Sequence, residues 1–267
     1  MALDPAVPGT IPTVYREYAP APALRPWLVC AWTLEVGNGG DHHRQRVLPD
    51  GCADIVWIGE VRPLVVGPMT HASLATLQPR TSLVGLRFRP EVAAAVLHAD
   101  AGELTDRDVP LDLLWAGGTA RDASARLREA RTPEARAAAA QDFLGARRTA
   151  FGAPDPVVRH AVSLLASPGR RIGRLADEVG LSERQLNRRF QASVGYSPKV
   201  FQRILRFQRL LALAQRGGAI QLGRMAFLAG YADQAHMTRE VSEFADTTPS
   251  LLLGRADSAL AGSDLLP

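Results

Sequence analysis

Short apolar runs separated by turn-forming residues dominate the chain from Trp27 to Arg89. Runs of this length, bounded by Gly, Pro, Asn and Asp, are typical of β-strands joined by turns. Residues 1–26 are rich in Pro and Ala and lack periodicity, so we expect an extended arm there. The pattern predicts a small barrel or sandwich. Its predicted strands include Trp27–Leu34, Asp54–Ile58, Leu64–Val66 and Leu83–Phe88.

Helical periodicity replaces the strand pattern after Pro90. This proline suits the first position of a helix that continues through Val96. Further helices are expected at Leu111–Trp115, Ala120–Arg131 and Pro133–Leu144, before a linker over residues 145–156. From Asp155 onward every segment has a helical pattern. The expected helices are Val157–Ala166, Ile172–Val179, Glu183–Val194, Pro198 to about Gln215, Leu222–Ala229, Gln234–Ala245 and one that begins at Thr248-Pro249.

This order of elements predicts an α+β fold class. A β-rich N-terminal domain with helices, residues 1–150, precedes an all-α domain over residues 151–267. The length of 267 residues suits two domains of roughly 100–200 residues each. No apolar stretch is long enough to predict a transmembrane helix, and no secretory signal is visible. We therefore expect a cytoplasmic protein.

The helical half contains the same unit twice. Ser182 and Asp233 are the expected N-caps of two equivalent helices. Aligning these caps pairs Leu186 with Met237, Arg188 with Arg239, Phe190 with Val241, Gly195 with Asp246 and Pro198 with Pro249. Upstream, Leu175-Ala176 and Gly180 match Met225-Ala226 and Gly230, with the second turn one residue longer.

Each unit has the composition of a helix-turn-helix. A short helix, a turn that contains Gly and a capped second helix follow one another. The small residues Ala176 and Ala226 allow the paired helices to approach closely, and the Gly turn sets a sharp angle. In this motif the second helix presents an exposed face to the DNA major groove. One helical hairpin is a common structural element, but two at fixed spacing indicate two helix-turn-helix units that bind DNA.

Residues 155–253 resemble the DNA-binding domain of the AraC/XylS family of bacterial transcription regulators. In the first unit the resemblance rests on Ile172, Leu175-Ala176, Gly180, Ser182, Leu186, Arg188, Phe190, Gly195 and Ser197-Pro198. In the second it rests on residues 228–236, then Arg239, Phe244 and Pro249. The chain departs from the family pattern at Val241, where Phe is frequent, and at Asp246, where Gly is frequent. Both positions concern packing after the second helix.

Residues 20–145 resemble, more loosely, the N-terminal domains that accompany some members of this family. The similar segments are residues 24–27, 47–56, 66–68 and 86–88. The resemblance implies a domain that senses a small molecule or supports dimerisation.

The periodicity of the second helices selects the residues that face outward. With Leu186 and Phe190 toward the core, the DNA-binding candidates in the first unit are Arg184, Gln185, Asn187 and Arg188. In the second unit they are Gln234, His236, Thr238 and Arg239, with Ala235 as a candidate thymine-methyl contact. Arg can bond guanine bidentately, and Gln or Asn can bond adenine. The alternatives are a solvated polar face, an ion pair or phosphate contact for Arg188 and Arg239, and a surface histidine at His236.

The charge is unevenly distributed along the chain. Residues 1–154 have a balance of −1, whereas residues 155–255 hold 14 Arg and one Lys against eight acidic residues, a balance of +7. A basic half favours a polyanionic partner. The helix from Pro198 to Gln215 would span about 27 Å, close to the roughly 34 Å turn of a DNA duplex. The arginines on or near this helix suit phosphate contacts or, equally, a soluble surface; they are Arg203, Arg206, Arg209 and Arg216.

The N-terminal half offers little catalytic chemistry. All four Trp lie before residue 116 and suit core packing, or the lining of a ligand pocket. Asp50 and Asp54 could orient a polar ligand or form a turn, since Pro-Asp-Gly favours turns. The adjacent His42 and His43 would face opposite ways on a strand. We find no phosphate-binding loop, nucleophile elbow or zinc-protease motif, so we predict no enzyme, no cofactor and no metal.

The sequence thus favours a sequence-specific DNA-binding transcriptional regulator whose two units read adjacent major-groove segments. Its expected partner is double-stranded DNA, without a membrane. Further candidate partners are a small-molecule effector, RNA polymerase and a second copy of the chain as a homodimer. The alternative is a small-molecule-binding or enzymatic N-terminal domain joined to a helical protein-interaction domain.

Overall fold

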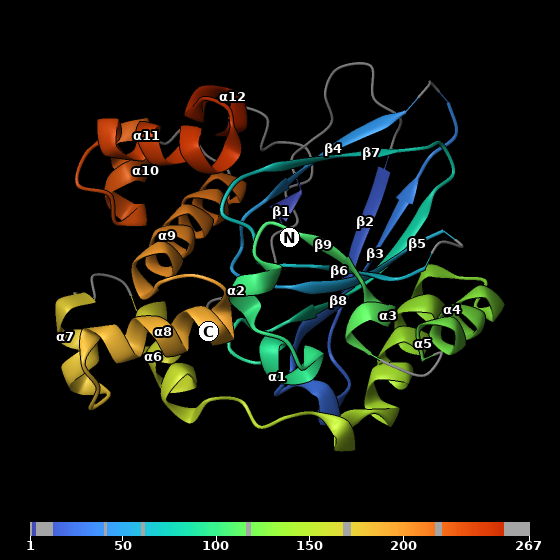
Figure 1. Cartoon of the computed structure of the whole chain (residues 1–267). Helices are drawn as coiled ribbons and strands as arrows, with labels where there is room; N and C mark the ends of the chain where they lie inside the picture. Colours follow the sequence, from blue (N-terminus) through green and yellow to red (C-terminus); the bar gives the residue numbers. More distant parts are fainter. Residues whose placement is uncertain are drawn as a thin grey trace.

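Two antiparallel sheets form the N-terminal half of the computed structural model, which describes residues 2–3, 13–39, 42–59, 62–115, 119–167, 172–216 and 221–253 (Figure 1). The larger sheet has the order β2-β3-β8-β5-β6-β9, and the smaller has the order β1-β4-β7. The strands of the larger sheet are β2 (Thr13–Tyr18), β3 (Leu28–Val36), β8 (Ser82–Phe88), β5 (Asp54–Ile58), β6 (Leu64–Val66) and β9 (Asp108–Pro110). Those of the smaller are β1 (Ala2–Leu3), β4 (His43–Leu48) and β7 (Ser73–Leu77).

Each face of the larger sheet buries its own set of side chains, because successive residues of a strand point to opposite faces. Trp32 and Val56 point between the two sheets, whereas Ile55 and Trp57 point to the opposite face. Helices cover that opposite face (Figure 1). These helices are α1 (Ala93–Leu97), α2 (Ala101–Leu104), α3 (Leu111–Leu114), α4 (Thr119–Glu129) and α5 (Pro133–Ala146).

The four predicted strands are present, with limits shifted by two residues or fewer. Two expectations for this half are wrong. The arm before Trp27 contains β2, which pairs with β3 along its whole length from Thr13 to Tyr18. The helix after Pro90 begins at Ala93, because Pro90 to Val92 first form a turn. His43, the first residue of β4, is buried, whereas His42, which precedes the strand, is exposed.

The helical half has one continuous core, and its fold class is the one predicted. Its elements are α6 (Pro156–Ala166), α7 (Ile172–Glu178), α8 (Glu183–Val194), α9 (Pro198–Gln215), α10 (Leu222–Ala229), α11 (Gln234–Ala245) and α12 (Pro249–Leu253). Buried side chains of α9, such as Ile204 and Phe207, join the core residues of α7 and α8 to those of α10 and α11. In the part of the chain that the structure describes, no helix has the length and apolar character needed to cross a bilayer.

The two halves are in close contact through the turn after β4. Leu48 is buried among the core residues of the helical half. Gln208 Nε2 on α9 donates to the Pro49 carbonyl oxygen at 2.6 Å. A Cβ on Gly51, whose φ is +89°, would lie 2.9 Å from the ring of Phe201. A chain with a side chain at this position could not adopt the same close packing.

Candidate nucleic-acid interface

The turns of the two helix-turn-helix units have the same backbone hydrogen bonds. Gly180 and Gly230 take left-handed conformations, with φ of +70° and +92°. The N–H of Leu181 donates to the Ala176 carbonyl at 3.0 Å, and the N–H of Tyr231 donates to the Ala226 carbonyl at 2.9 Å. These bonds satisfy carbonyls that a helix end leaves open, and Gly tolerates the required φ. The predicted repeat is therefore present in the backbone.

The second helices, α8 and α11, also begin and end alike. Ser182 accepts from the N–H of Gln185 at 3.3 Å, and Asp233 accepts from the N–H of His236 at 2.7 Å. Both helices have 12 residues and end in a left-handed residue, Gly195 in α8 and Asp246 in α11. Asp246 takes this conformation at φ +48°, which Asp tolerates better than most residues. Asp246 therefore ends α11 in the same left-handed conformation with which Gly195 ends α8, although it is not a glycine.

The predicted reading face of α8 is exposed. Leu186 and Phe190 are buried on the opposite side. The exposed residues are Arg184, Gln185, Asn187 and Arg188. The side-chain oxygen of Gln185 accepts hydrogen bonds from the backbone and the hydroxyl of Ser182, at 3.0 and 2.8 Å. Gln185 is thus part of a capping box, which the sequence analysis did not identify.

The face of α11 contains two kinds of side chain. Gln234, Ala235 and Arg239 are exposed, and nothing among the described residues bonds the Arg239 side chain. His236 and Thr238 are half-buried instead. The His236 ring lies 3.3 Å from Glu240 and accepts from the Ala232 N–H at 3.4 Å, and the Thr238 hydroxyl donates to the Gln234 carbonyl at 2.9 Å.

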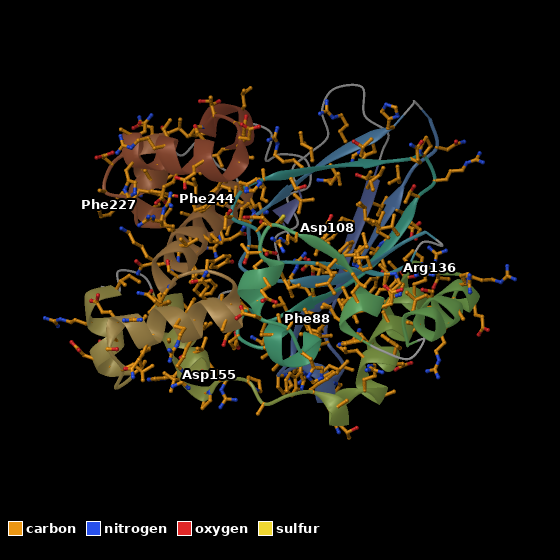
Figure 2. The ribbon with its side chains drawn as sticks, in the orientation of Figure 1. Phe88, Asp108, Arg136, Asp155, Phe227 and Phe244 are labelled. Atoms are coloured by element: carbon orange, nitrogen blue, oxygen red, sulfur yellow. The ribbon has the colours of Figure 1, made fainter. Side chains whose placement is uncertain are left out.

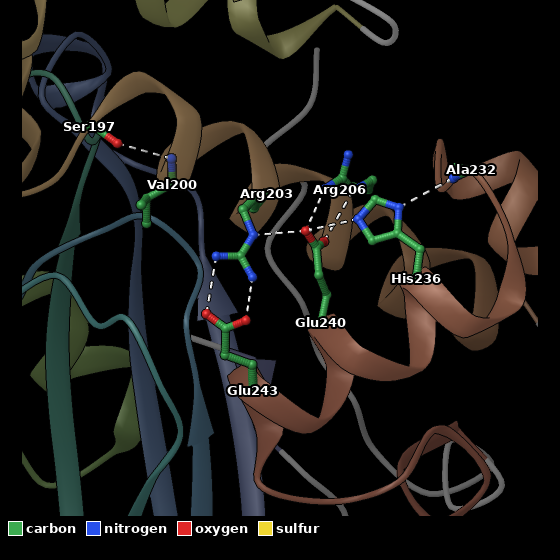
Figure 3. Close-up of polar contacts among 8 residues, drawn as sticks. All are labelled: Ser197, Val200, Arg203, Arg206, Ala232, His236, Glu240 and Glu243. Atoms are coloured by element: carbon green, nitrogen blue, oxygen red, sulfur yellow. Dashed lines mark hydrogen bonds and ion pairs between the residues drawn. The ribbon is translucent and has the colours of Figure 1, made fainter.

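Glu240 joins α11 to the long helix α9 (Figure 3). Its carboxylate accepts from Arg203 Nε at 2.8 Å and from Arg206 Nε at 3.2 Å. Arg203 also pairs with Glu243. Burial raises the pKa of Glu240, but the hydrogen bonds from Arg206 and Arg203 outweigh burial and hold the pKa below its ordinary value. The carboxylate stays charged and fixes α11 against α9.

Most arginines of α9 therefore have partners within the protein. Arg203 and Arg206 hold Glu240, and Arg209 donates to the Ala166 carbonyl at 2.9 Å. Arg216 is exposed. The sequence left two uses open for these arginines, phosphate contacts or a soluble surface. For Arg203, Arg206 and Arg209 the structure favours neither, because their side chains bond other parts of the protein. Their partners lie 34 to 43 residues away in the chain, so local patterns do not reveal them.

The structure adds two residues to the candidate set. Arg174 on α7 and Arg224 on α10 are exposed and occupy equivalent positions, two residues before Ala176 and Ala226. In helix-turn-helix proteins the first helix crosses the DNA backbone, where arginine binds phosphate. The sequence could have revealed this pair. When the alignment of Ser182 with Asp233 is extended to the first helices, Arg174 aligns with Arg224.

A cavity of about 250 Å³ lies between the two sheets of the N-terminal half. Its lining is mostly apolar and includes Trp32, Val47 and Val56. Three consecutive exposed charged residues, Asp106, Arg107 and Asp108, also line the cavity, and Asp108 is labelled in Figure 2. The Trp32 indole N–H, at the cavity wall, donates to Asp54 at 3.3 Å.

Asp54 and Asp50 both contact the buried guanidinium of Arg87, each at 3.4 Å from Nε. Burial opposes the charge on Arg87, but Asp54, Tyr15 and Asp50 raise its pKa well above the ordinary value. Asp50 also accepts from the Cys52 N–H at 2.9 Å and so shapes the turn that touches α9. Of the two roles that the sequence left open, Asp50 has the turn role, whereas Asp54 lies in β5. Both aspartates also belong to an internal ion cluster around Arg87, which the sequence did not predict.

Comparisons with known proteins match two parts of the chain. Residues 175–255 match a family described as "Helix-turn-helix domain", and residues 16–110 match one described as "Domain of unknown function (DUF6597)". A search of curated proteins finds no match.

Several solved structures are similar to this chain. A probable AraC family transcriptional regulator from Rhodopseudomonas palustris CGA009 is 27% identical, over 38% of this chain and 93% of that chain, with a TM-score of 0.32. ToxT from Vibrio cholerae strain SCE256 with bound unsaturated fatty acid is 12% identical, over 94% and 98% of the two chains, with a TM-score of 0.44. The AraC-like transcriptional activator CuxR is 14% identical, over 85% and 90%, with a TM-score of 0.30.

The repeated units, their exposed second helices and the matching domain define a helix-turn-helix DNA-binding transcriptional regulator. A protein of this class is a transcription factor and not an enzyme. Residues 175–255 contain the helix-turn-helix domain of a transcriptional regulator of the AraC type.

Proposed function

We propose that α8 and α11 read two successive major-groove segments of one DNA site. The observation that supports this geometry is the shared core, in which α9 packs against both units. With 18 residues, α9 spans about 27 Å, near the roughly 34 Å that separates major-groove segments on one side of a duplex. A rigid spacer of this length suits one chain that contacts both segments.

Exposure divides the candidate residues into two roles. Arg184, Asn187 and Arg188 on α8, with Gln234 and Arg239 on α11, contact base edges. Gln185, His236 and Thr238 belong to the same faces, but their internal hydrogen bonds orient the helices, so they contribute to reading through their backbone position. Arg174 and Arg224 bind phosphates that flank the two segments.

Binding-site selection with the full chain tests this proposal. Arg188→Ala should weaken binding by about 1–3 kcal/mol and relax preference at one end of the site, and Arg239→Ala should do so about 10 base pairs away. Arg159→Ala, an exposed arginine on α6, is the control for general loss of charge. If both reading variants relax the same base pair, or lose affinity without relaxed preference, the two-reader geometry is wrong.

We further propose that the N-terminal half, residues 1–150, senses a small, mostly apolar effector in the cavity between its sheets, and that residues 151–267 bind DNA in the cytoplasm. A buried path supports this. It leads from the cavity through Trp32 and Asp54 to Arg87, then through Asp50 to the turn under α9. An effector that displaces Trp32 would change the contacts of Asp54 and, through Arg87, the turn at Gly51.

A thermal-shift screen of the full chain with small apolar compounds tests the sensing role. A true effector should lose its shift in Ser73→Trp, which blocks the cavity mouth. Trp32→Phe keeps an aromatic wall but removes the N–H bond to Asp54, so it should bind the effector without the effector's influence on DNA affinity. An effector that still changes DNA affinity in Trp32→Phe would contradict the proposed path.

A further inference from the structure

A second cavity lies outside the pair of sheets, and nothing in the DNA-reading or sensing roles uses it. Its volume is about 560 Å³, more than twice that of the cavity between the sheets. It opens where the end of β5 and the turn between β7 and β8 meet α4 and α5. A volume of this size is within the range of pockets that bind small organic molecules.

The floor of this outer cavity is apolar. Trp57, Val84 and Leu127 are buried side chains that line it. The Trp57 ring packs edge-on against Phe143, at 6.0 Å between centroids, which fixes its orientation. Within the described ranges, the Trp57 indole N–H has no hydrogen-bond partner although it is buried. Buried donors are nearly always paired, so an acceptor atom of a ligand would complete this one.

The charged side chains that line the outer cavity in the described part of the chain are all arginines. Arg136, labelled in Figure 2, lies on α5. Its side chain is held by Glu35, at 3.1 Å, and by the Ser82 hydroxyl. Arg80 and Arg128 are exposed at the rim, and neither side chain bonds another described residue. The field in the cavity is therefore positive, and guanidinium groups bind carboxylates and sulfonates well.

We propose that the outer cavity binds an organic anion with an aromatic or branched apolar body. The body lies on the floor formed by Trp57, Val84 and Leu127, and the anionic group faces Arg80 and Arg128. Ile58 and Leu77 line both this cavity and the one between the sheets. The two cavities therefore share part of a wall, so a ligand in one cavity changes the positions of side chains that line the other.

Isothermal titration of the full chain with 2-naphthoate tests this proposal, with 2-naphthamide as the uncharged analogue. Naphthoate should bind more tightly than the amide. The double variant Arg80→Ala, Arg128→Ala should lose about tenfold in affinity, as the product of roughly threefold for each exposed charge pair. Thr76→Trp, an exposed position at the cavity, should abolish binding by filling the space.

Arg126→Ala is the matched control, because Arg126 is an exposed arginine of α4 outside the cavity lining. It should leave naphthoate affinity unchanged. Equal affinity for naphthoate and naphthamide, or no effect of the double variant, would overturn the proposal. If Ser73→Trp instead abolishes binding and Thr76→Trp does not, naphthoate binds between the sheets. That result overturns the outer site and leaves the sensing role intact.

Discussion

The second helix of the first helix-turn-helix unit, α8, is fixed mainly by elements that precede the two units. The second helix of the second unit, α11, is fixed mainly by α9, which lies between the units. Helix α8 packs against α1 and α2 of the N-terminal half, and Arg189 on α8 pairs with Asp155 at the start of α6, at 2.6 Å. Helix α11 is fixed by Glu240, whose arginine partners belong to α9. Its contact with the N-terminal half is at its C-terminal end, where Arg46 donates to the Ala245 carbonyl.

This difference shows that two copies of one sequence motif can be coupled to different parts of the molecule. A rearrangement of the N-terminal half reaches α8 through its neighbours α1 and α2. The Thr105 hydroxyl, just after α2, donates to the Gly195 carbonyl at the end of α8 at 2.8 Å. The orientation of α11 relative to α9 depends on an ion cluster within the helical half. We therefore expect effector-dependent changes to appear in the DNA segment that we propose α8 reads.

Removal of the Glu240 carboxylate should have the largest effect and should act on the second unit. Glu240→Ala leaves two half-buried arginines, Arg203 and Arg206, without their shared partner. Breaking a buried ion pair in this way costs about 3–5 kcal/mol of unfolding free energy. Chemical denaturation of the full chain measures the loss. Glu243→Ala is the control, because its exposed carboxylate should contribute about 0–1 kcal/mol. Equal losses in both variants would contradict the role of Glu240.

The pH dependence of stability provides a second test of the same cluster. The pKa of Glu240 is lower in the folded protein than in the unfolded chain, where it is about 4.3. Its stabilising contribution is therefore complete above that value and is lost as the pH falls through the folded pKa. Acid should destabilise the parent protein more than Glu240→Gln, whose side chain does not titrate. Parallel stability profiles for the two proteins would exclude this contribution.

Overpacking of the first helices should have the next largest effect, and it should separate the units. Ala176 and Ala226 are both buried where paired helices meet. Ala176→Phe and Ala226→Phe should each cost about 1–3 kcal/mol, because a bulky side chain pushes the helices apart. Site selection should show weaker preference at a different end of the site for each variant. A Phe variant with unchanged melting temperature and DNA binding would contradict the helix-turn-helix assignment.

Loss of Asp155 should have a smaller effect that is confined to the first unit. Its carboxylate caps α6 by accepting from the Val157 N–H at 2.9 Å, and it also holds Arg189. Asp155→Ala should cost about 1–2 kcal/mol through loss of the cap. Asp155→Asn retains a capping side chain and removes only the ion pair with Arg189, so it should cost about 0–1 kcal/mol. Denaturation curves that rank the two variants in the opposite order would contradict this division.

The smallest expected effects come from Arg174 and Arg224, and these should be equal. Arg174→Ala and Arg224→Ala should each weaken binding to all DNA sequences alike and make the salt dependence shallower by about one. Fluorescence anisotropy over a series of salt concentrations measures the slope. A change of preference at one base pair would mean that the residue contacts a base.

The sequence predicted the helical half closely because its signals are local. N-caps such as Ser182 and αL glycines such as Gly195 act within a few residues, so the limits of α8, α10 and α11 match the prediction. Strand β4 was missed because its inward positions include His43 and Gln45, which break the apolar alternation.

Long-range partners were the other source of error. The phosphate role considered for Arg203 and Arg206 ignored Glu240, which lies more than 30 residues away in the chain. The ion cluster around Arg87 likewise joins three strands and a turn that are distant in sequence. Such contacts depend on tertiary structure and leave no local pattern in the chain.

The insertion of Leu48 into the core of the helical half limits how this regulator can be re-engineered. A chimera that joins these helices to another sensor would leave an empty site where Leu48 packs and a free Gln208 amide where Pro49 accepts. The segment that must be transferred to keep the DNA-binding helices intact is therefore larger than the helical half. Domain exchange should carry residues 46–52 along with the DNA-binding helices, or replace them with a turn of the same shape that ends in glycine.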